Sequence, residues 1–359
     1  MTEQIIEINV NNLEEKYSFN KVAKQASGAV MYQQGKAVLI AAVAIDEKAV
    51  NEDFLPLTVQ YMEKSYAAAK IPGGFIKRET KPGDFETLTS RIVDRSLRPL
   101  FPKGFHYPVT ISVMVVSSDS DVDMQIAALH AASAALYVSD IPVQQSIAGV
   151  RIGKIDNEMI INPTLNQQDE STLDLLVVGS GNDVLMIEMR TMASEIIDDV
   201  EVDMIDPMMG GVPLILEHQE CNELDEESLV TAIALAGDAI SVASEKYSEG
   251  FASAARTPLD LVLAEDKVDE TLYAYIESNY ASDVEAAISH MAKSERSTEL
   301  KKVRTKIMEA LESEGKEAEK ELVSKVLERY KKTVVRAMII DKGIRADGRT
   351  LDEVRPISI

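Results

Sequence analysis

A cationic stretch between residues 71 and 105 is the part of this sequence best suited to binding chemistry. It holds seven Lys or Arg side chains against four Asp or Glu, although the chain of 359 residues has a formal net charge of -23. Salt confines the influence of an exposed charge to about 10 Å, so an anionic ligand responds to this local excess. The stretch is therefore a candidate site for a polyanion. Its cations are Lys77, Arg78, Lys81, Arg91, Arg95, Arg98 and Lys103.

The glycine-containing segment from Pro72 to Arg78 groups side chains of complementary types. After two glycines it presents the aromatic Phe75, the aliphatic Ile76 and the cations Lys77 and Arg78. Aromatic faces stack on unpaired bases while Lys and Arg bind phosphates, so this grouping is typical of sites for single-stranded nucleic acid. An ordinary surface loop has a similar composition, and the residues alone leave that alternative open.

Three arginines follow at helical spacing. Arg91, Arg95 and Arg98 stand at i, i+4 and i+7, which places them on one face of a helix. They can extend the same binding surface. Alternatively, they form ion pairs with neighbouring acids, namely Asp84, Glu86 and Asp94.

Residues 1–245 are predicted to form an α+β domain of mixed sheets with packed helices. Apolar runs of strand length occupy 38–45 and 109–116. Turn residues at 156–157 and 179–183 predict two hairpins, over 150–162 and 173–189. Helices are predicted over 87–97, 124–138 and 226–247. Asp121 and Asp123 are available to cap the second of these helices.

The character of the sequence changes after Pro258. Apolar residues recur at helical spacing, as in Val303, Ile307, Met308 and Leu311, and the charges alternate in sign. Such charges usually lie on solvated faces. We therefore predict an all-helical spacer domain over residues 246–340. Residues 341–359 are rich in turns and end in what reads as the start of a strand, so a further domain is expected to begin there.

Composition excludes several classes of protein. The single cysteine, Cys221, allows no internal disulfide and no multi-cysteine metal site, and it fits a reducing, cytoplasmic location. The acidic N-terminus lacks the features of a signal peptide. The longest apolar run, Ala37 to Ile45, is far shorter than the ~20 residues of a membrane helix. We expect a protein without a membrane-spanning segment.

No metal site is predicted in this chain. The run from Asp119 to Asp123 has the alternating acids of a calcium loop, but Met124 stands where glycine is required and His130 where glutamate is required. Helix capping is the better interpretation. The acidic run from Glu195 to Glu227 is interpreted as a solvated surface.

Several motifs together resemble the first core domain of the bacterial polynucleotide phosphorylase family. They cover residues 53–61, 66–68, 71–75, 86–88, 91–102 and 131–136. The resemblance implies a ribonuclease-PH-like core followed by an all-α helical domain. The closing residues resemble the opening of a second such core: Arg345, Asp347, Gly348, Arg349 and Arg355–Ile357. By this resemblance the chain is the N-terminal half of a longer protein, cut at the start of its second core.

The resemblance also implies an activity. The family's members are phosphate-dependent 3′-to-5′ exoribonucleases that release nucleoside diphosphates in mRNA degradation, and they act as homotrimers. The family loop Phe-Phe-Arg-Arg lines a central channel and grips the RNA. Here it reads Phe75, Ile76, Lys77 and Arg78, so one stacking ring and one guanidinium are replaced. Arg91, Arg95 and Arg98 are assigned to the same RNA surface, and Arg345 and Arg349 are further candidates. Between 189 and 211 the family pattern is not followed.

Catalysis is expected elsewhere in the full-length protein. In the family, the residues that hold inorganic phosphate and Mg²⁺ lie in the second core, beyond Ile359. We therefore expect no catalytic residue, no bound metal and no cofactor in this chain, which would supply RNA binding and ring assembly. The expected partners are single-stranded RNA, further copies of the protein and degradosome-type proteins. Two alternatives stay open, a non-catalytic RNA-binding ring subunit and a pure scaffold.

Overall fold

The computed structural model describes residues 2–355, except 51, 53, 74–80, 192–199, 206–212, 217–223, 265–268, 291–292 and 316–318. The chain divides into two compact units, Met1–Ala264 and Glu265–Ile359. The predicted boundary after residue 245 is wrong, because Tyr247 and Phe251 still lie in the core of the first unit. Their rings stack on each other and contact Tyr17 of the first sheet.

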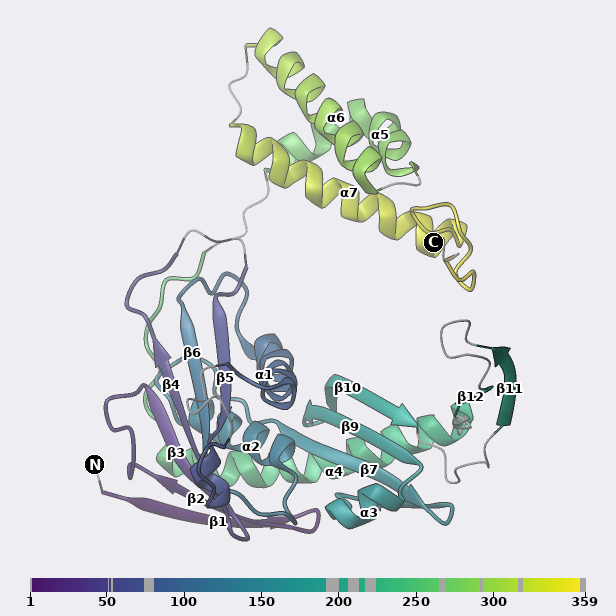
Figure 1. Cartoon of the computed structure of the whole chain (residues 1–359). Helices are drawn as coiled ribbons and strands as arrows, with labels where there is room; N and C mark the ends of the chain where they lie inside the picture. Colours follow the sequence, from purple (N-terminus) through teal and green to yellow (C-terminus); the bar gives the residue numbers. More distant parts are fainter. Residues whose placement is uncertain are drawn as a thin grey trace. The chain divides into compact units, whose positions relative to one another are not determined.

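A six-stranded sheet forms one side of the first unit (Figure 1). Its order is β1-β2-β3-β4-β6-β5, and every neighbouring pair is antiparallel except β5 and β6. Buried and less buried residues alternate along β4 and β6, as expected for strands with one face in the core. Both strands were predicted. The strands are β1 Gln4–Val10, β2 Leu13–Phe19, β3 Gly28–Gln34, β4 Ala37–Ile45, β5 Leu57–Glu63 and β6 Val109–Ser117.

An antiparallel four-stranded sheet has the order β10-β9-β7-β8. The two predicted hairpins are confirmed. Asp156 and Asn157 take φ values of 48° and 70°, the left-handed conformation that their side chains tolerate. The strands are β7 Ala148–Ile155, β8 Glu158–Ile161, β9 Leu173–Ser180 and β10 Asp183–Thr191. A further pair consists of β11 Val200–Ile205 and β12 Pro213–Leu216.

The α-helices of the first unit are α1 Asp84–Leu97, α2 Met124–Tyr137, α3 Leu165–Glu170 and α4 Glu226–Phe251. Short 3₁₀ helices are η1 Ser65–Ala68, η2 Arg98–Leu100 and η3 Ala252–Ala254. Figure 1 shows α1 and α2 between the two sheets. α2 is buried on all sides from Ile126 to Tyr137, because its alanines let β3, β4 and β7 approach closely. Asp123 caps it by accepting hydrogen bonds from Gln125 N and Ile126 N, as predicted.

The segment Glu226–Ala254 is long and apolar enough to cross a membrane by length and composition alone. Burial explains part of this apolar character, since 33% of the apolar window lies inside the structure. Ala232, Ala236, Ile240 and Tyr247 of this helix are buried in the core, and α4 packs against β7 and β9. The helix therefore serves as a core element of the first unit.

A buried polar cluster lies where α2, α4 and the first sheet meet. The Glu15 carboxylate accepts hydrogen bonds from Tyr32 (2.7 Å), Tyr247 (2.6 Å) and His130 Nδ1 (2.7 Å). The other imidazole nitrogen, Nε2, accepts from Gly149 N–H, which assigns the proton to Nδ1. Burial raises the pKa of Glu15, but the interaction with His130 and the two tyrosine hydroxyls outweighs it and lowers the pKa. Glu15 is therefore a buried carboxylate satisfied by three donors.

Residues 259–264, which fall in the predicted helical domain, form no helix and belong to the first unit. From Glu270 to Lys342 the described residues of the second unit form helices with short connections, as predicted. The second unit consists of α5 Glu270–Ile288, α6 Lys293–Ser313 and α7 Lys320–Lys342. Its own core includes Ile276, Val284, Ile307, Val323 and Val326. α7 ends at Gly343, which takes the left-handed φ of 62° that favours glycine at this position.

The candidates Arg345 and Arg349 hold the turn after α7 together. Arg349 hydrogen-bonds to Asp347 at 3.0 Å and lowers the pKa of that carboxyl to about 2. Arg345 donates to the Leu351 carbonyl. Both guanidinium groups thus have internal partners. Whether this turn opens a second core stays a prediction.

Candidate nucleic-acid interface and an adjoining pocket

Helix α1 carries Arg91 and Arg95, and Arg98 follows it as the first residue of η2. The helix begins three residues earlier than predicted, at Asp84. Glu86 fixes its first turn by accepting hydrogen bonds from Gly83 N (2.7 Å) and from Glu63 N of β5 (2.7 Å). The carboxylate that the sequence offers as an arginine partner is thus used to begin the helix and to attach it to the sheet. Ile92, Val93 and Leu97 form the buried face of α1.

Arg98 is a structural residue. It binds Asp94 through two nitrogens, at 2.7 and 3.1 Å, and donates to the carbonyls of Leu55 (2.8 Å) and Leu57 (3.2 Å). Of the two alternatives predicted for these arginines, Arg98 therefore shows the ion pair with a neighbouring acid. Its guanidinium fastens the end of α1 to the start of β5.

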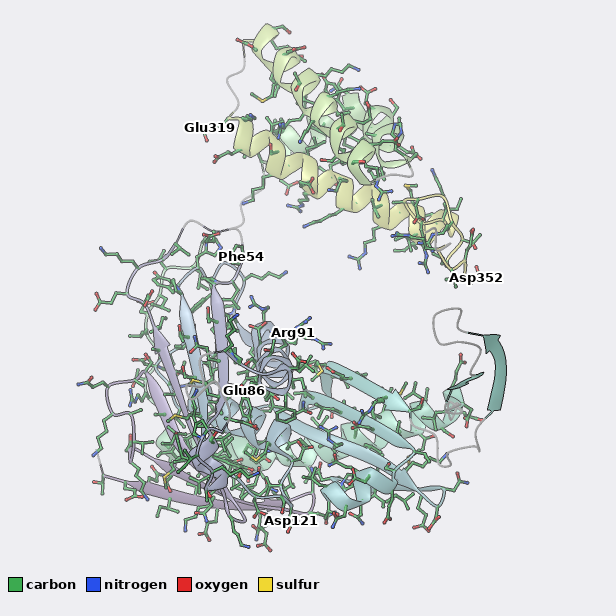
Figure 2. The ribbon with its side chains drawn as sticks, viewed as in Figure 1. Phe54, Glu86, Arg91, Asp121, Glu319 and Asp352 are labelled. Atoms are coloured by element: carbon green, nitrogen blue, oxygen red, sulfur yellow. The ribbon has the colours of Figure 1, made fainter. Side chains whose placement is uncertain are left out.

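Arg95 and Arg91 remain on the solvent side of α1. Arg95 forms an ion pair with Glu188 of β10 at 3.1 Å, and both side chains are about half exposed (50% and 49%). Such an exposed pair contributes little and separates readily in favour of another anion. Arg91 is exposed and has no hydrogen bond or ion pair with any described residue (Figure 2). Among the described residues, the α1 face thus offers one guanidinium without a partner, that of Arg91, and one weakly held, that of Arg95.

The glycine-containing segment from Pro72 to Arg78 precedes this helix in the sequence. Pro72 and Gly73 are described, and Ile71 beside them is almost fully exposed. The predicted contact residues Phe75, Ile76, Lys77 and Arg78 lie outside the described residues. Their role therefore stays a prediction.

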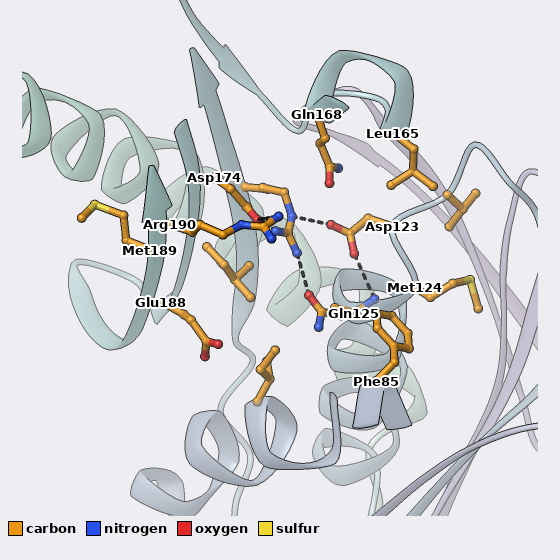
Figure 3. A pocket seen from close by; sticks show the side chains of 14 residues that line it. Phe85, Asp123, Met124, Gln125, Leu165, Gln168, Asp174, Glu188, Met189 and Arg190 are labelled. Carbon is orange, nitrogen blue, oxygen red and sulfur yellow. Dashed lines mark hydrogen bonds and ion pairs between the residues drawn. The ribbon is translucent and has the colours of Figure 1, made fainter. Parts of the chain in front are cut away.

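A pocket of about 510 Å³ opens beside α1 (Figure 3). Helices α1, α2 and α3 and strands β7, β9 and β10 all contribute side chains to it. The lining residues are Phe85, Ile92, Val122, Asp123, Met124, Gln125, Arg151, Leu165, Gln168, Asp174, Leu176, Glu188, Met189 and Arg190. Glu188, the partner of Arg95, lies in this wall, so the pocket adjoins the α1 surface.

Arg151 of β7 is the centre of the pocket's polar wall. Its Nε donates to Asp123 at 2.6 Å, its Nη1 to Asp174, and its Nη2 to the Gln125 side-chain oxygen at 2.8 Å. Burial alone lowers the pKa of Arg151, but Asp123 and Asp174 outweigh it and raise the pKa. The guanidinium is therefore permanently charged and is balanced by the two carboxylates.

The two carboxylates beside Arg151 already have a partner. No cluster of three or more metal-ligating side chains exists among the described residues. The sequence analysis missed this pocket. In the sequence, Arg151 stands between the apolar residues Val150 and Ile152 of one strand, and this position is a signal of a buried charge. The residues that pair with Arg151 lie on other elements, so their spacing in the sequence does not reveal them.

Comparisons with known proteins identify the family. Residues 14–142 and 145–201 match domains 1 and 2 of the 3′ exoribonuclease family, and residues 271–350 match the polyribonucleotide nucleotidyltransferase RNA binding domain. The chain is 80% identical, over its full length, to a polyribonucleotide nucleotidyltransferase from Sulfurovum sp.. The chain belongs to the polyribonucleotide nucleotidyltransferase family. Its fold is the ribonuclease-PH-like core with a helical domain that the resemblance implied.

Further relatives support this assignment. Enzymes of the same name from Nitratiruptor sp. and Campylobacter curvus are 48% and 51% identical, each over 98% of this chain. The chain spans about half the length of these relatives, 48% to 49% of each. An activity that depends on the remaining half of such a relative is therefore not assigned to the residues of this chain.

Proposed function

We propose that this chain is the RNA-holding part of a phosphate-dependent 3′-to-5′ exoribonuclease that takes part in mRNA degradation. The single observation that carries the proposal is the solvent face of α1, where Arg91 has no partner among the described residues and Arg95 has only a half-exposed one. Phosphate oxygens are suitable partners for such guanidinium groups. The loop of Phe75, Lys77 and Arg78, which directly precedes α1, would extend this surface. Membership of the family supports RNA as the polyanion.

Phosphorolysis is proposed to depend on residues outside this chain. Mg²⁺ needs open carboxylate oxygens, but Asp123 and Asp174 are already bound by Arg151, so the pocket does not fit the metal. Mg²⁺ and inorganic phosphate would then act in the remaining half of the full-length protein. A homotrimer in the cytoplasm, with degradosome-type partners, completes the proposal for that protein.

Titration of single-stranded RNA tests the binding role. Arg91→Ala should weaken binding of all RNA sequences equally and reduce the slope of log affinity against log salt by about one. Lys77→Ala/Arg78→Ala should reduce it by about two. Lys24→Ala, an exposed cation outside the interface, is the matched control and should change neither.

Two results would contradict the proposal. Unchanged affinity in both interface variants would favour the scaffold alternative. Release of nucleoside diphosphates by the purified chain, in the presence of RNA, Mg²⁺ and phosphate, would show that a complete active site lies within it.

A further inference from the structure

Two glutamine side chains in the pocket have fixed orientations and unused hydrogen-bonding atoms. Arg151 can only donate, so Gln125 must present its oxygen to it at 2.8 Å, and the Gln125 amide nitrogen is left without a partner among the described residues. The Pro163 carbonyl can only accept, so Gln168 must present its nitrogen to it at 3.1 Å. No described residue donates a hydrogen bond to the Gln168 amide oxygen. The pocket therefore offers one amide donor and one amide acceptor.

The remaining wall is largely apolar. Phe85 of α1 is 46% exposed, and its ring lies at the pocket together with Met124, Leu165 and Met189 (Figure 3). Met124 lies near Phe85 and Met189 lies across the pocket from it (Figure 3). An aromatic ring with a thioether near it is a suitable surface for a flat, polarisable group. Free donors and acceptors in such a wall select ligands that can hydrogen-bond over those that are purely apolar.

The charges of the pocket argue against an anionic ligand. Arg151 is balanced by Asp123 and Asp174, and the five charged lining residues include three acids and two arginines. A phosphate placed here would face carboxylates whose arginine is already engaged. The pocket therefore fits a flat, uncharged ring with donors and acceptors on its edge.

We propose that this pocket binds an unstacked nucleobase. Each base presents donors and acceptors along its edge, and an amide can pair with such an edge. Gln125 would donate to the base and Gln168 would accept from it, while Phe85 would stack on its face. The proposal rests on the proposed RNA-binding function, because the phosphates flanking the base would lie on Arg91 and on Arg95 once it separates from Glu188.

The test compares three probes: a short single-stranded oligoadenylate, an abasic strand of equal length, and free adenosine. Gln168→Leu removes the acceptor and Phe85→Ala removes the ring. Each should lower affinity for oligoadenylate about 5- to 100-fold, the range for one stacked base, and leave affinity for the abasic strand unchanged. Phe54→Ala, an exposed aromatic outside the pocket, is the control and should affect none of the probes. Arg91→Ala should weaken binding of both strands equally.

Several outcomes decide the matter. If Gln168→Leu and Phe85→Ala weaken the abasic strand as much as oligoadenylate, or weaken neither, the pocket does not bind a base. Adenosine binding that is lost in Gln168→Leu would show that free nucleosides also enter. If the wild-type chain binds neither strand, the proposed RNA function fails, and adenosine alone then decides whether the pocket accepts a base.

Discussion

Replacing Arg151 with methionine should be among the most destabilising single changes in the first unit. Methionine keeps much of the apolar stem but removes the guanidinium. The Arg151 side chain is only 8% exposed, and those of Asp123 and Asp174 are 16% and 19% exposed. The variant would leave the poorly solvated Asp123 carboxylate without its cation, and Asp174 with only the exposed Arg190 at 3.4 Å. Breaking a buried pair in this way costs about 3–5 kcal/mol, a large part of the 5–15 kcal/mol that typically stabilises a domain.

Arg190→Met provides the matched control. Arg190 contacts the same carboxylate, Asp174, but at 3.4 Å and with its side chain 67% exposed. An exposed pair contributes about 0–1 kcal/mol, so this variant should be nearly as stable as the wild type. The difference between the two arginines isolates the effect of burial.

Urea unfolding followed by circular dichroism would measure both variants, since the chain has no tryptophan. Hydrogen exchange of peptides from β7 would separate the first unit from the second. The triple variant Arg151→Met/Asp123→Asn/Asp174→Asn should regain most of the loss, because no poorly solvated carboxylate is left without a cation. Arg190 also loses its partner in this variant, but its side chain is 67% exposed. A loss below about 1 kcal/mol in Arg151→Met, or a triple variant no more stable than the single one, would refute the reasoning.

Two further predictions concern the core. Glu15→Gln should lower the free energy of unfolding at pH 7 by about 1–3 kcal/mol, because an amide nitrogen would face a buried donor. Since the native pKa of Glu15 is lowered, the stability advantage of the wild type is full above about pH 4.5 and is lost as the pH falls through that native pKa. Urea melts at several pH values would measure this loss. A deficit that stays constant down to pH 3 would contradict this. Gly28→Ala should destabilise the protein markedly in thermal melts, because its new Cβ would lie 2.1 Å from the Ala135 carbonyl oxygen. Gly237→Ala, where the new Cβ meets open space on a helix, should raise the stability by about 0.5–1 kcal/mol. Equal effects of the two substitutions would count against the close packing of β3 on α2.

Elements with a strong local signal could be predicted from the sequence. The apolar runs of β4 and β6, the Asp156–Asn157 turn and the Asp123 cap each depend on neighbouring residues, and the structure confirms them. The hairpin of β1 and β2 was missed. Its strands carry charges on their exposed faces, so no continuous apolar run marks them.

The site was predictable only where geometry follows from one helix. The spacing of Arg91, Arg95 and Arg98 placed the first two on α1 and the third at its end. Tertiary contacts decided the partner of Arg95 and the backbone partners of Arg98. Arg95 donates a hydrogen bond to Glu188 of β10, which is far from it in the sequence, and Arg98 donates one to the carbonyl of Leu55. The pocket around Arg151 is built from six elements and leaves no contiguous pattern in the sequence.

The complete burial of α2 has a consequence for motion. Solvent can reach its amide groups only if the surrounding strands move away, because β3, β4 and β7 all pack against it. Amide protons from Ile126 to Tyr137 should therefore exchange with deuterium at the rate of global opening of the first unit. The exchange rates of the α2 amides would thus measure how often the whole first unit unfolds. Unfolding of the second unit would not change these rates.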